Sequence, residues 1–106
     1  MDIRSIKIMA VALRKLLKKK GIDADLILLF GSRAKNLEHK DSDIDLAVVS
    51  RHYGKDRFTE SALLNRLAQT IDCRIEAVPI GLKDYMKKET ISPILHEIIK
   101  DGTPLI

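Results

Sequence analysis

Residues 26–49 read LILLFGSRAKNLEHKDSDIDLAVV, and this stretch decides the fold. It begins with a wholly apolar run, residues 26–30, which stops at Gly31 and predicts a short strand buried on both faces. A polar stretch follows, and we expect a short helical turn near its start. Residues 43–49 alternate acid and hydrophobe before a fully apolar end, which predicts a second strand.

One helix is expected before this pair of strands in the sequence, and another after it. Residues 2–20 carry apolar side chains at three- and four-residue spacing, which is typical of a helix with one buried face. That face comprises Ile6, Met9, Ala10, Leu13, Leu16 and Leu17. A second helix is expected over residues 57–70. Its predicted inward residues are Phe58, Ala62, Leu63, Leu67 and Thr70.

The last third of the chain predicts a third strand over residues 73–80, a helical turn over 83–88 and a helix over 92–100. Pro79 cannot donate to a strand ladder, so its end of the strand is expected at an edge. The tail is expected to be extended. We therefore predict an α/β fold, a short mixed sheet of three or four strands packed with helices.

Length and composition favour one domain spanning residues 1–106. Hydrophobic residues make up 45% and charged residues 32%, a globular balance. The longest apolar run, residues 8–13, has six residues, whereas a membrane span needs about 20. We see no export signal. The single cysteine, Cys73, cannot form an internal disulfide, which favours a reduced, cytoplasmic compartment. We interpret Cys73 as a packing residue.

The net charge of +4 weakly favours contact with phosphates or an acidic protein. Lysines at 18–20 suit a solvated helix end, with a phosphate-binding patch as the alternative. The chain has no Trp and 4% aromatic residues. It therefore lacks the stacking residues of single-strand nucleic-acid binders, which disfavours direct binding of long nucleic acid.

Asp43 and Asp45 are two residues apart on a predicted strand, so their side chains share a face. Two neighbouring carboxylates repel each other unless a cation lies between them. Their oxygens suit Mg²⁺ or Mn²⁺, with water and substrate phosphates completing the site. The alternative is a solvated, acidic strand start.

Gly31 and Ser32 follow a buried strand and precede a helix start. Glycine allows close backbone approach, and amides at a helix N-terminus attract an anion. Arg33 offers a cation for a phosphate. The alternative is an ordinary turn with an N-cap serine and an exposed arginine.

Glu76 lies between apolar neighbours on the third predicted strand, where an acid needs a partner. It is a candidate second-metal ligand or base for an attacking hydroxyl. The alternative is a solvent-facing position paired with Arg74 or a lysine. Asp72 is a rival third carboxylate, although its position favours a role at the strand start.

The remaining reactive side chains point to no second site. Histidines 39, 52 and 96 lack metal-ligand spacing and are expected in loops or on the surface, with His39 inside the motif loop. For Tyr53 and Tyr85 we favour packing or partner contact over stacking on a ligand ring or accepting a transferred group.

Gly31-Ser32, ten residues, then Asp43-Ile44-Asp45 resembles the Gly-Ser-x10-Asp-x-Asp signature of the DNA-polymerase-β-like nucleotidyltransferases. The surrounding string is similar to that of the minimal nucleotidyltransferases of this superfamily. The resemblance extends to the leading helix, all three strands and Glu76. One departure is Asn36-Leu37, where many relatives carry a glycine.

The resemblance implies a small polymerase-β-like fold and a Mg²⁺-dependent transfer of AMP from ATP. Asp43 and Asp45, with Glu76, would bind Mg²⁺, two ions being expected. Gly31, Ser32 and Arg33 would bind the nucleotide phosphates. Glu76 would assist deprotonation of the acceptor hydroxyl, which attacks the α-phosphate as pyrophosphate leaves.

Larger relatives carry an acceptor-binding domain that has no counterpart here, so we expect the acceptor on another protein or at a homo- or hetero-oligomeric interface. Minimal nucleotidyltransferases commonly pair with a HEPN-domain toxin. The leading hypothesis is an antitoxin that adds AMP to a tyrosine of that toxin. One alternative is an antitoxin that neutralises the toxin by binding alone. Another is a transferase for a small molecule such as an antibiotic.

Overall fold

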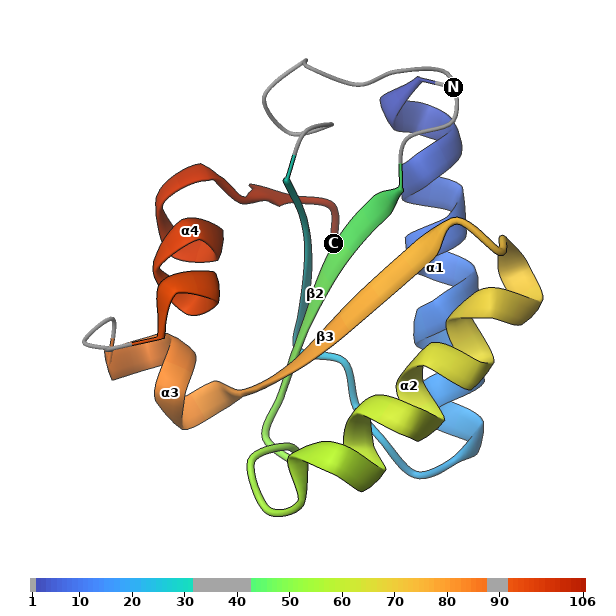
Figure 1. Ribbon diagram of the computed structural model, residues 1–106. Coiled ribbons are helices and arrows are strands. Elements are labelled where there is room, and N and C mark those ends of the chain that lie inside the picture. Colours follow the sequence, from blue (N-terminus) through green and yellow to red (C-terminus); the bar gives the residue numbers. More distant parts are fainter. Residues whose placement is uncertain (1, 32–42, 88–91) are drawn as a thin grey trace.

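The computed structural model describes residues 2–31, 43–87 and 92–106 (Figure 1). Helices and strands alternate along most of the chain, as the sequence predicts. The elements are α1 (Ile3–Lys19), β1 (Leu26–Phe30), β2 (Ile44–Ser50), α2 (Arg57–Ile71), β3 (Ile75–Gly81), α3 (Leu82–Lys87), α4 (Pro93–Asp101) and β4 (Thr103–Pro104). The turn expected near residue 32 lies outside the described residues.

The strands form one mixed sheet in the order β3-β2-β1-β4. β2 lies antiparallel to β1 and parallel to β3, and β4 pairs antiparallel with β1. The predicted mixed sheet is therefore confirmed, with the two-residue β4 formed by part of the tail. β3 lies at an edge, as Pro79 requires.

Helices cover both faces of the sheet, with α1 and α2 on one side and α4 on the other (Figure 1). Alternate strand residues fill two cores, because successive side chains point to opposite faces. Ile44, Leu46 and Val48 of β2 join the core under α1 and α2. Ala47 and Val49 join the core under α4. β1 is buried on both faces, as expected.

The first helix buries the predicted face. Ile6, Ala10, Leu13 and Leu17 are buried, and Asp2 caps its start by accepting the Ser5 amide at 3.0 Å. The last helix begins one residue after its predicted start, since the Ser92 side chain caps it.

The inward face of α2 was predicted only in part, since Leu67 packs against the core but three of the predicted residues are exposed. Phe58 is 84% exposed, and Ala62 and Thr70 are also exposed. Leu64 and Ala68 are fully buried in their place, with Leu67 packed beside them. Phe58 lies in the first helical turn, immediately after the Asp56 cap. An apolar residue so close to the helix start does not set the buried face, because the sheet packs against the turns that follow.

Cys73 is exposed, which contradicts the packing role predicted for it. The third strand begins at Ile75 and not at Cys73, because Asp72 and Arg74 form an ion pair of 2.7 Å that shapes a turn before the strand. Cys73 lies in this turn, where no core residue covers it.

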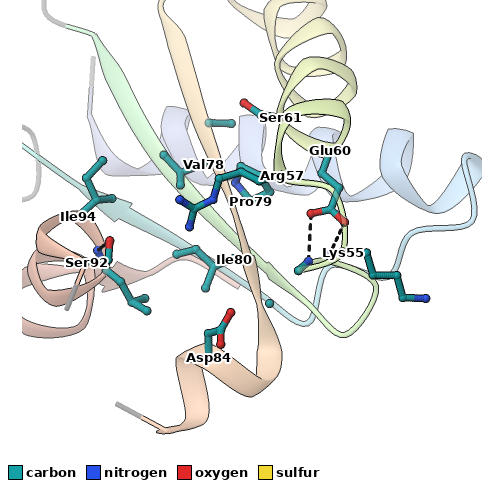
Figure 2. Close-up of a pocket in the computed structure, with 14 residues that line it drawn as sticks. Lys55, Arg57, Glu60, Ser61, Val78, Pro79, Ile80, Asp84, Ser92 and Ile94 are labelled. Atoms are coloured by element: carbon teal, nitrogen blue, oxygen red, sulfur yellow. Dashed lines mark hydrogen bonds between the residues drawn. The ribbon is translucent and has the colours of Figure 1, made fainter. Parts of the chain in front are cut away.

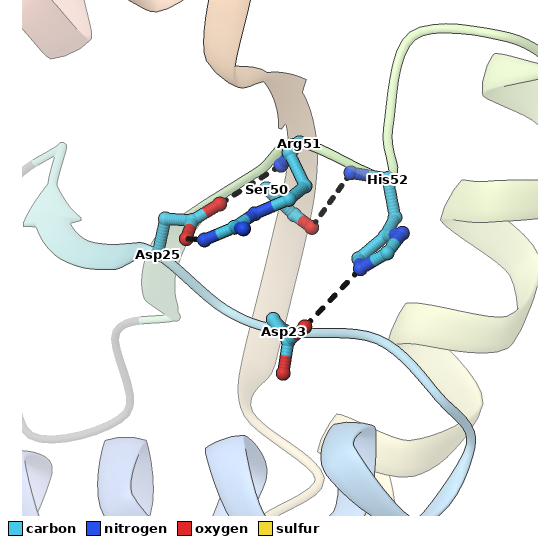
Figure 3. A network of polar contacts seen from close by, with 5 residues as sticks. All are labelled: Asp23, Asp25, Ser50, Arg51 and His52. Atoms are coloured by element: carbon cyan, nitrogen blue, oxygen red, sulfur yellow. Dashed lines mark hydrogen bonds and ion pairs between the residues drawn. The ribbon is translucent and has the colours of Figure 1, made fainter.

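A polar network closes the end of the sheet where β1 begins and β2 ends (Figure 3). Arg51 donates to Asp25 from its backbone at 2.9 Å and its guanidinium at 2.7 Å. His52 lies 3.3 Å from Asp23, and its amide donates to the buried Ser50 hydroxyl. These bonds join the segment before β1 to the turn after β2.

Among the described residues, no helix is long and apolar enough to cross a membrane.

Candidate active site

Asp45 lies on β2, an inner strand of the sheet, near the N-terminal ends of β2 and β3. It is paired with Phe30 on β1 and with Glu76 on β3. Paired residues project from the same face, so Asp45 and Glu76 share the side on which α4 packs. Asp43 precedes β2 by one residue, and strand alternation places it on that same side. The structure thus brings together the three predicted carboxylates.

Burial raises the pKa of the Asp45 carboxyl, and the charges of Glu76, Asp43 and Glu97 raise it further. Asp45 is half-buried, whereas Asp43 and Glu76 are exposed. A half-buried carboxylate among other carboxylates favours either a proton or a bound cation.

Glu97 is a fourth acid at this site that sequence reasoning missed. It belongs to α4, whose Leu95 and Ile98 pack against Leu28 and Phe30 of β1. Its proximity to Asp45 depends on that packing, which no local spacing in the sequence reveals.

Gly31 comes within contact distance of the Asp45 carboxyl. Its φ of +75° is in the region that favours glycine, and a Cβ atom there would overlap a carboxylate oxygen of Asp45. Any other residue would push the aspartate out of place. Ser32 and Arg33 lie outside the described residues, so their roles as phosphate ligands stay predictions.

The donor set suits a hard divalent cation. Carboxylate oxygens are the ligands that Mg²⁺ prefers, and it usually takes only one or two of them together with water and phosphate oxygens. Within residues 2–31, 43–87 and 92–106, no three His, Cys, Asp or Glu side chains form a ready metal cage. The pair Asp43 and Asp45 therefore fits a metal that is shared with a phosphorylated substrate.

The rival acid Asp72 is engaged elsewhere. Its carboxylate accepts from the Arg74 guanidinium at 2.7 Å and from the Arg74 amide at 2.9 Å. This confirms the predicted place of Asp72 at the strand start. It also removes Arg74 as the expected partner of Glu76.

Two exposed histidines and one buried tyrosine are further candidate reactive side chains. His52 and His96 are exposed, as predicted, and His39 lies outside the described residues. Tyr53 is a packing residue, because its ring belongs to the core under α1 and α2. Burial raises its pKa to about 12. A phenol that is buried and so weakly acidic is a poor nucleotidyl acceptor.

The family follows from comparison with known proteins. A family model described as polymerase beta, nucleotidyltransferase, matches residues 12–106. The chain belongs to this nucleotidyltransferase family. The match covers the whole sheet and every carboxylate of the site. A comparison with curated proteins found no match.

Solved structures resemble this nucleotidyltransferase domain over most of its length. A toxin–antitoxin crystal structure with AMP-PNP shares 24% identity, with a TM-score of 0.55, over 94% of this chain and 72% of that one. A mutant of the toxin–antitoxin MntA–HpeT shares 25% identity, with a TM-score of 0.52, over 87% of this chain and 67% of that one. That mutant carries two aspartate-to-glutamate changes, two residues apart.

Proposed function

We propose that this nucleotidyltransferase transfers AMP from ATP to a tyrosine hydroxyl of a HEPN-domain toxin, and that it acts as the antitoxin of the pair in the cytoplasm. The observation that carries the proposal is the juxtaposition of Asp45 and Glu76 on one face of the sheet, in a chain of this family. The toxin–antitoxin origin of the 25%-identical neighbour supports a toxin as the partner.

Each residue has a distinct task in the proposed reaction. Asp43 and Asp45 would hold Mg²⁺, which supplies positive charge to the triphosphate and the leaving group. Gly31 leaves the Asp45 carboxyl in place, because it has no side chain to overlap that group. Glu76 takes the proton of the acceptor hydroxyl while the oxygen of that hydroxyl bonds to the α-phosphorus. The bond from that phosphorus to the bridging oxygen breaks, and pyrophosphate leaves.

The test uses ATP labelled at the α-phosphate, Mg²⁺ and the HEPN-domain partner. We expect the wild type to label the partner and Asp45→Asn to lose at least a hundredfold in rate. Asp23→Asn is the matched control, because Asp23 is an exposed acid at the opposite end of the sheet. Circular dichroism verifies that each variant is folded.

Two outcomes would replace the proposal. If the partner stays unlabelled while wild type and Asp45→Asn neutralise it equally, the protein is a binding antitoxin. If label passes to a free aminoglycoside in the absence of any partner protein, the protein is a small-molecule transferase.

A further inference from the structure

A groove of about 460 Å³ follows the outer edge of β3. Its floor is the strand from Ala77 to Gly81. Arg57 and Ser61 of α2 line one wall, and Ile94 and Leu95 of α4 line the other (Figure 2). This volume lies in the range of ligand-binding clefts, and its apolar floor with few polar groups is typical of them.

The strand edge in the groove is closed to another strand. Asn65 accepts from the Ala77 amide and donates to the Ala77 carbonyl, both at 2.8 Å. Pro79, the next residue on that edge, has no N–H to offer. A chain lying here would therefore be recognised through its side chains and not through a β-ladder.

Arg57 supplies a cation to the groove. Figure 2 shows its side chain reaching from the first turn of α2 across β3 toward the α4 wall. In the part of the chain that the structure describes, it forms no ion pair or hydrogen bond. Glu60 is engaged elsewhere, since it accepts the amides of Gly54, Lys55 and Asp56. The guanidinium is thus available for a carboxylate.

The groove begins next to Glu76 along β3, since Ala77 is the first strand residue that lines it. Val78 and Ile80 line it, and they lie two and four residues after Glu76 on the same face of β3. At about 3.3 Å per residue, these positions are about 7 and 13 Å from Glu76. An extended segment in the groove would therefore reach Glu76 within a few residues.

From this arrangement we infer that the β3-edge groove binds the acceptor polypeptide in extended form. Arg57 pairs with an acidic residue about four positions from the tyrosine that receives AMP. Asp84 of α3 lines the groove beyond the end of β3, where its carboxylate can accept a hydrogen bond from the same segment. The inference rests on the proposed function for the identity of the reacting residue, whereas the binding site rests on the groove itself.

Short synthetic peptides test the groove directly. Each carries one tyrosine and, about four residues away, either glutamate or glutamine. Peptides are made with the tyrosine before and after that residue. Fluorescence anisotropy measures their binding to the full chain. We expect the glutamate peptide to bind about tenfold more tightly than the glutamine peptide, and Arg57→Ala to abolish the difference. Arg66→Ala is the control, because Arg66 is exposed on the same helix and does not line the groove.

The two proposals fail separately in this experiment. If both peptides bind equally or neither binds, or if Arg66→Ala acts like Arg57→Ala, the groove inference is overturned. Label from α-phosphate-labelled ATP is followed in the same samples. If the glutamate preference depends on Arg57 and no label reaches the tyrosine, the groove stands and the transfer proposal fails.

Discussion

Gly31 is the residue whose substitution should separate backbone strain from damage to the site. Gly21 and Gly31 have φ angles of +80° and +75°, but only Gly31 is close to another group, the Asp45 carboxyl. Gly21→Ala should cost about 1 kcal/mol, from backbone strain alone. Gly31→Ala adds the overlap with Asp45 and should cost about 3 kcal/mol. Urea unfolding measures both, and equal losses would show that Asp45 moves aside freely.

Asp45 should destabilise the metal-free protein, because burial and the neighbouring acids disfavour its charged form. With EDTA at neutral pH, Asp45→Asn should raise the free energy of unfolding. Mg²⁺ with AMP-PNP should raise the melting temperature of the wild type and not of this variant. Asp84→Asn is the control for removing an exposed acid. An Asp45→Asn variant that is less stable than the wild type in EDTA would contradict this account.

Residues of the site were predictable where one segment holds them. Asp43 and Asp45 share a face through strand alternation, and Gly31 follows a strand whose limits the apolar run defines. Glu76 was a candidate because an acid between apolar strand residues needs a partner, but an exposed position stayed an equal alternative, because its pairing with Asp45 is a contact between strands. Glu97 was not predictable, since only the docking of α4 brings it near.

Among the elements, α2 shows why apolar spacing can mislead. Phe58 was expected inside at helical spacing with Ala62 and other residues of the segment, yet it is 84% exposed. The helix instead turns Leu64, Ala68 and the Asn65 amide toward the sheet. The buried face also carries a polar side chain that bonds the backbone of β3, and a count of apolar residues ignores it.

Asn65 should accordingly matter more than its polarity suggests. Asn65→Ala removes both bonds to Ala77 and leaves its backbone amide without that acceptor, so we expect a loss of about 2–3 kcal/mol. Asn65→Asp keeps the acceptor and loses the donor, and should also destabilise. Urea unfolding provides the measurement. Gln69→Ala, at an exposed position of α2, should change stability by less than about 0.5 kcal/mol. A similar effect of both alanine variants would contradict the stabilising role of the two Asn65–Ala77 hydrogen bonds.

At the scale of the whole molecule, the two ends of the sheet carry opposite kinds of polar chemistry. One end gathers carboxylates whose charges, together with burial, raise the pKa of Asp45. The other end is closed by the Asp25–Arg51 ion pair and the contact of His52 with Asp23 (Figure 3). The sheet between them has both faces covered by core residues. The fold thus keeps its binding chemistry at one end, while the opposite end holds the strands together.

Acid should weaken the ion pair between Asp25 and Arg51. The hydrogen bond from the Arg51 side chain holds the pKa of Asp25 below its ordinary value of 3.8. An acid with a lowered pKa in the folded state contributes stability that is complete above its unfolded pKa and is lost as the pH falls through the folded one. Asp25→Asn should therefore reduce the free energy of unfolding at pH 6, and its difference from the wild type should shrink as the pH falls below 3.8. Urea titrations from pH 2.5 to 7 measure the difference. Arg51→Met should behave in the same way, because it removes the other partner of the same ion pair. If the difference in unfolding free energy between variant and wild type persists unchanged into acid, the effect comes from packing and not from charge.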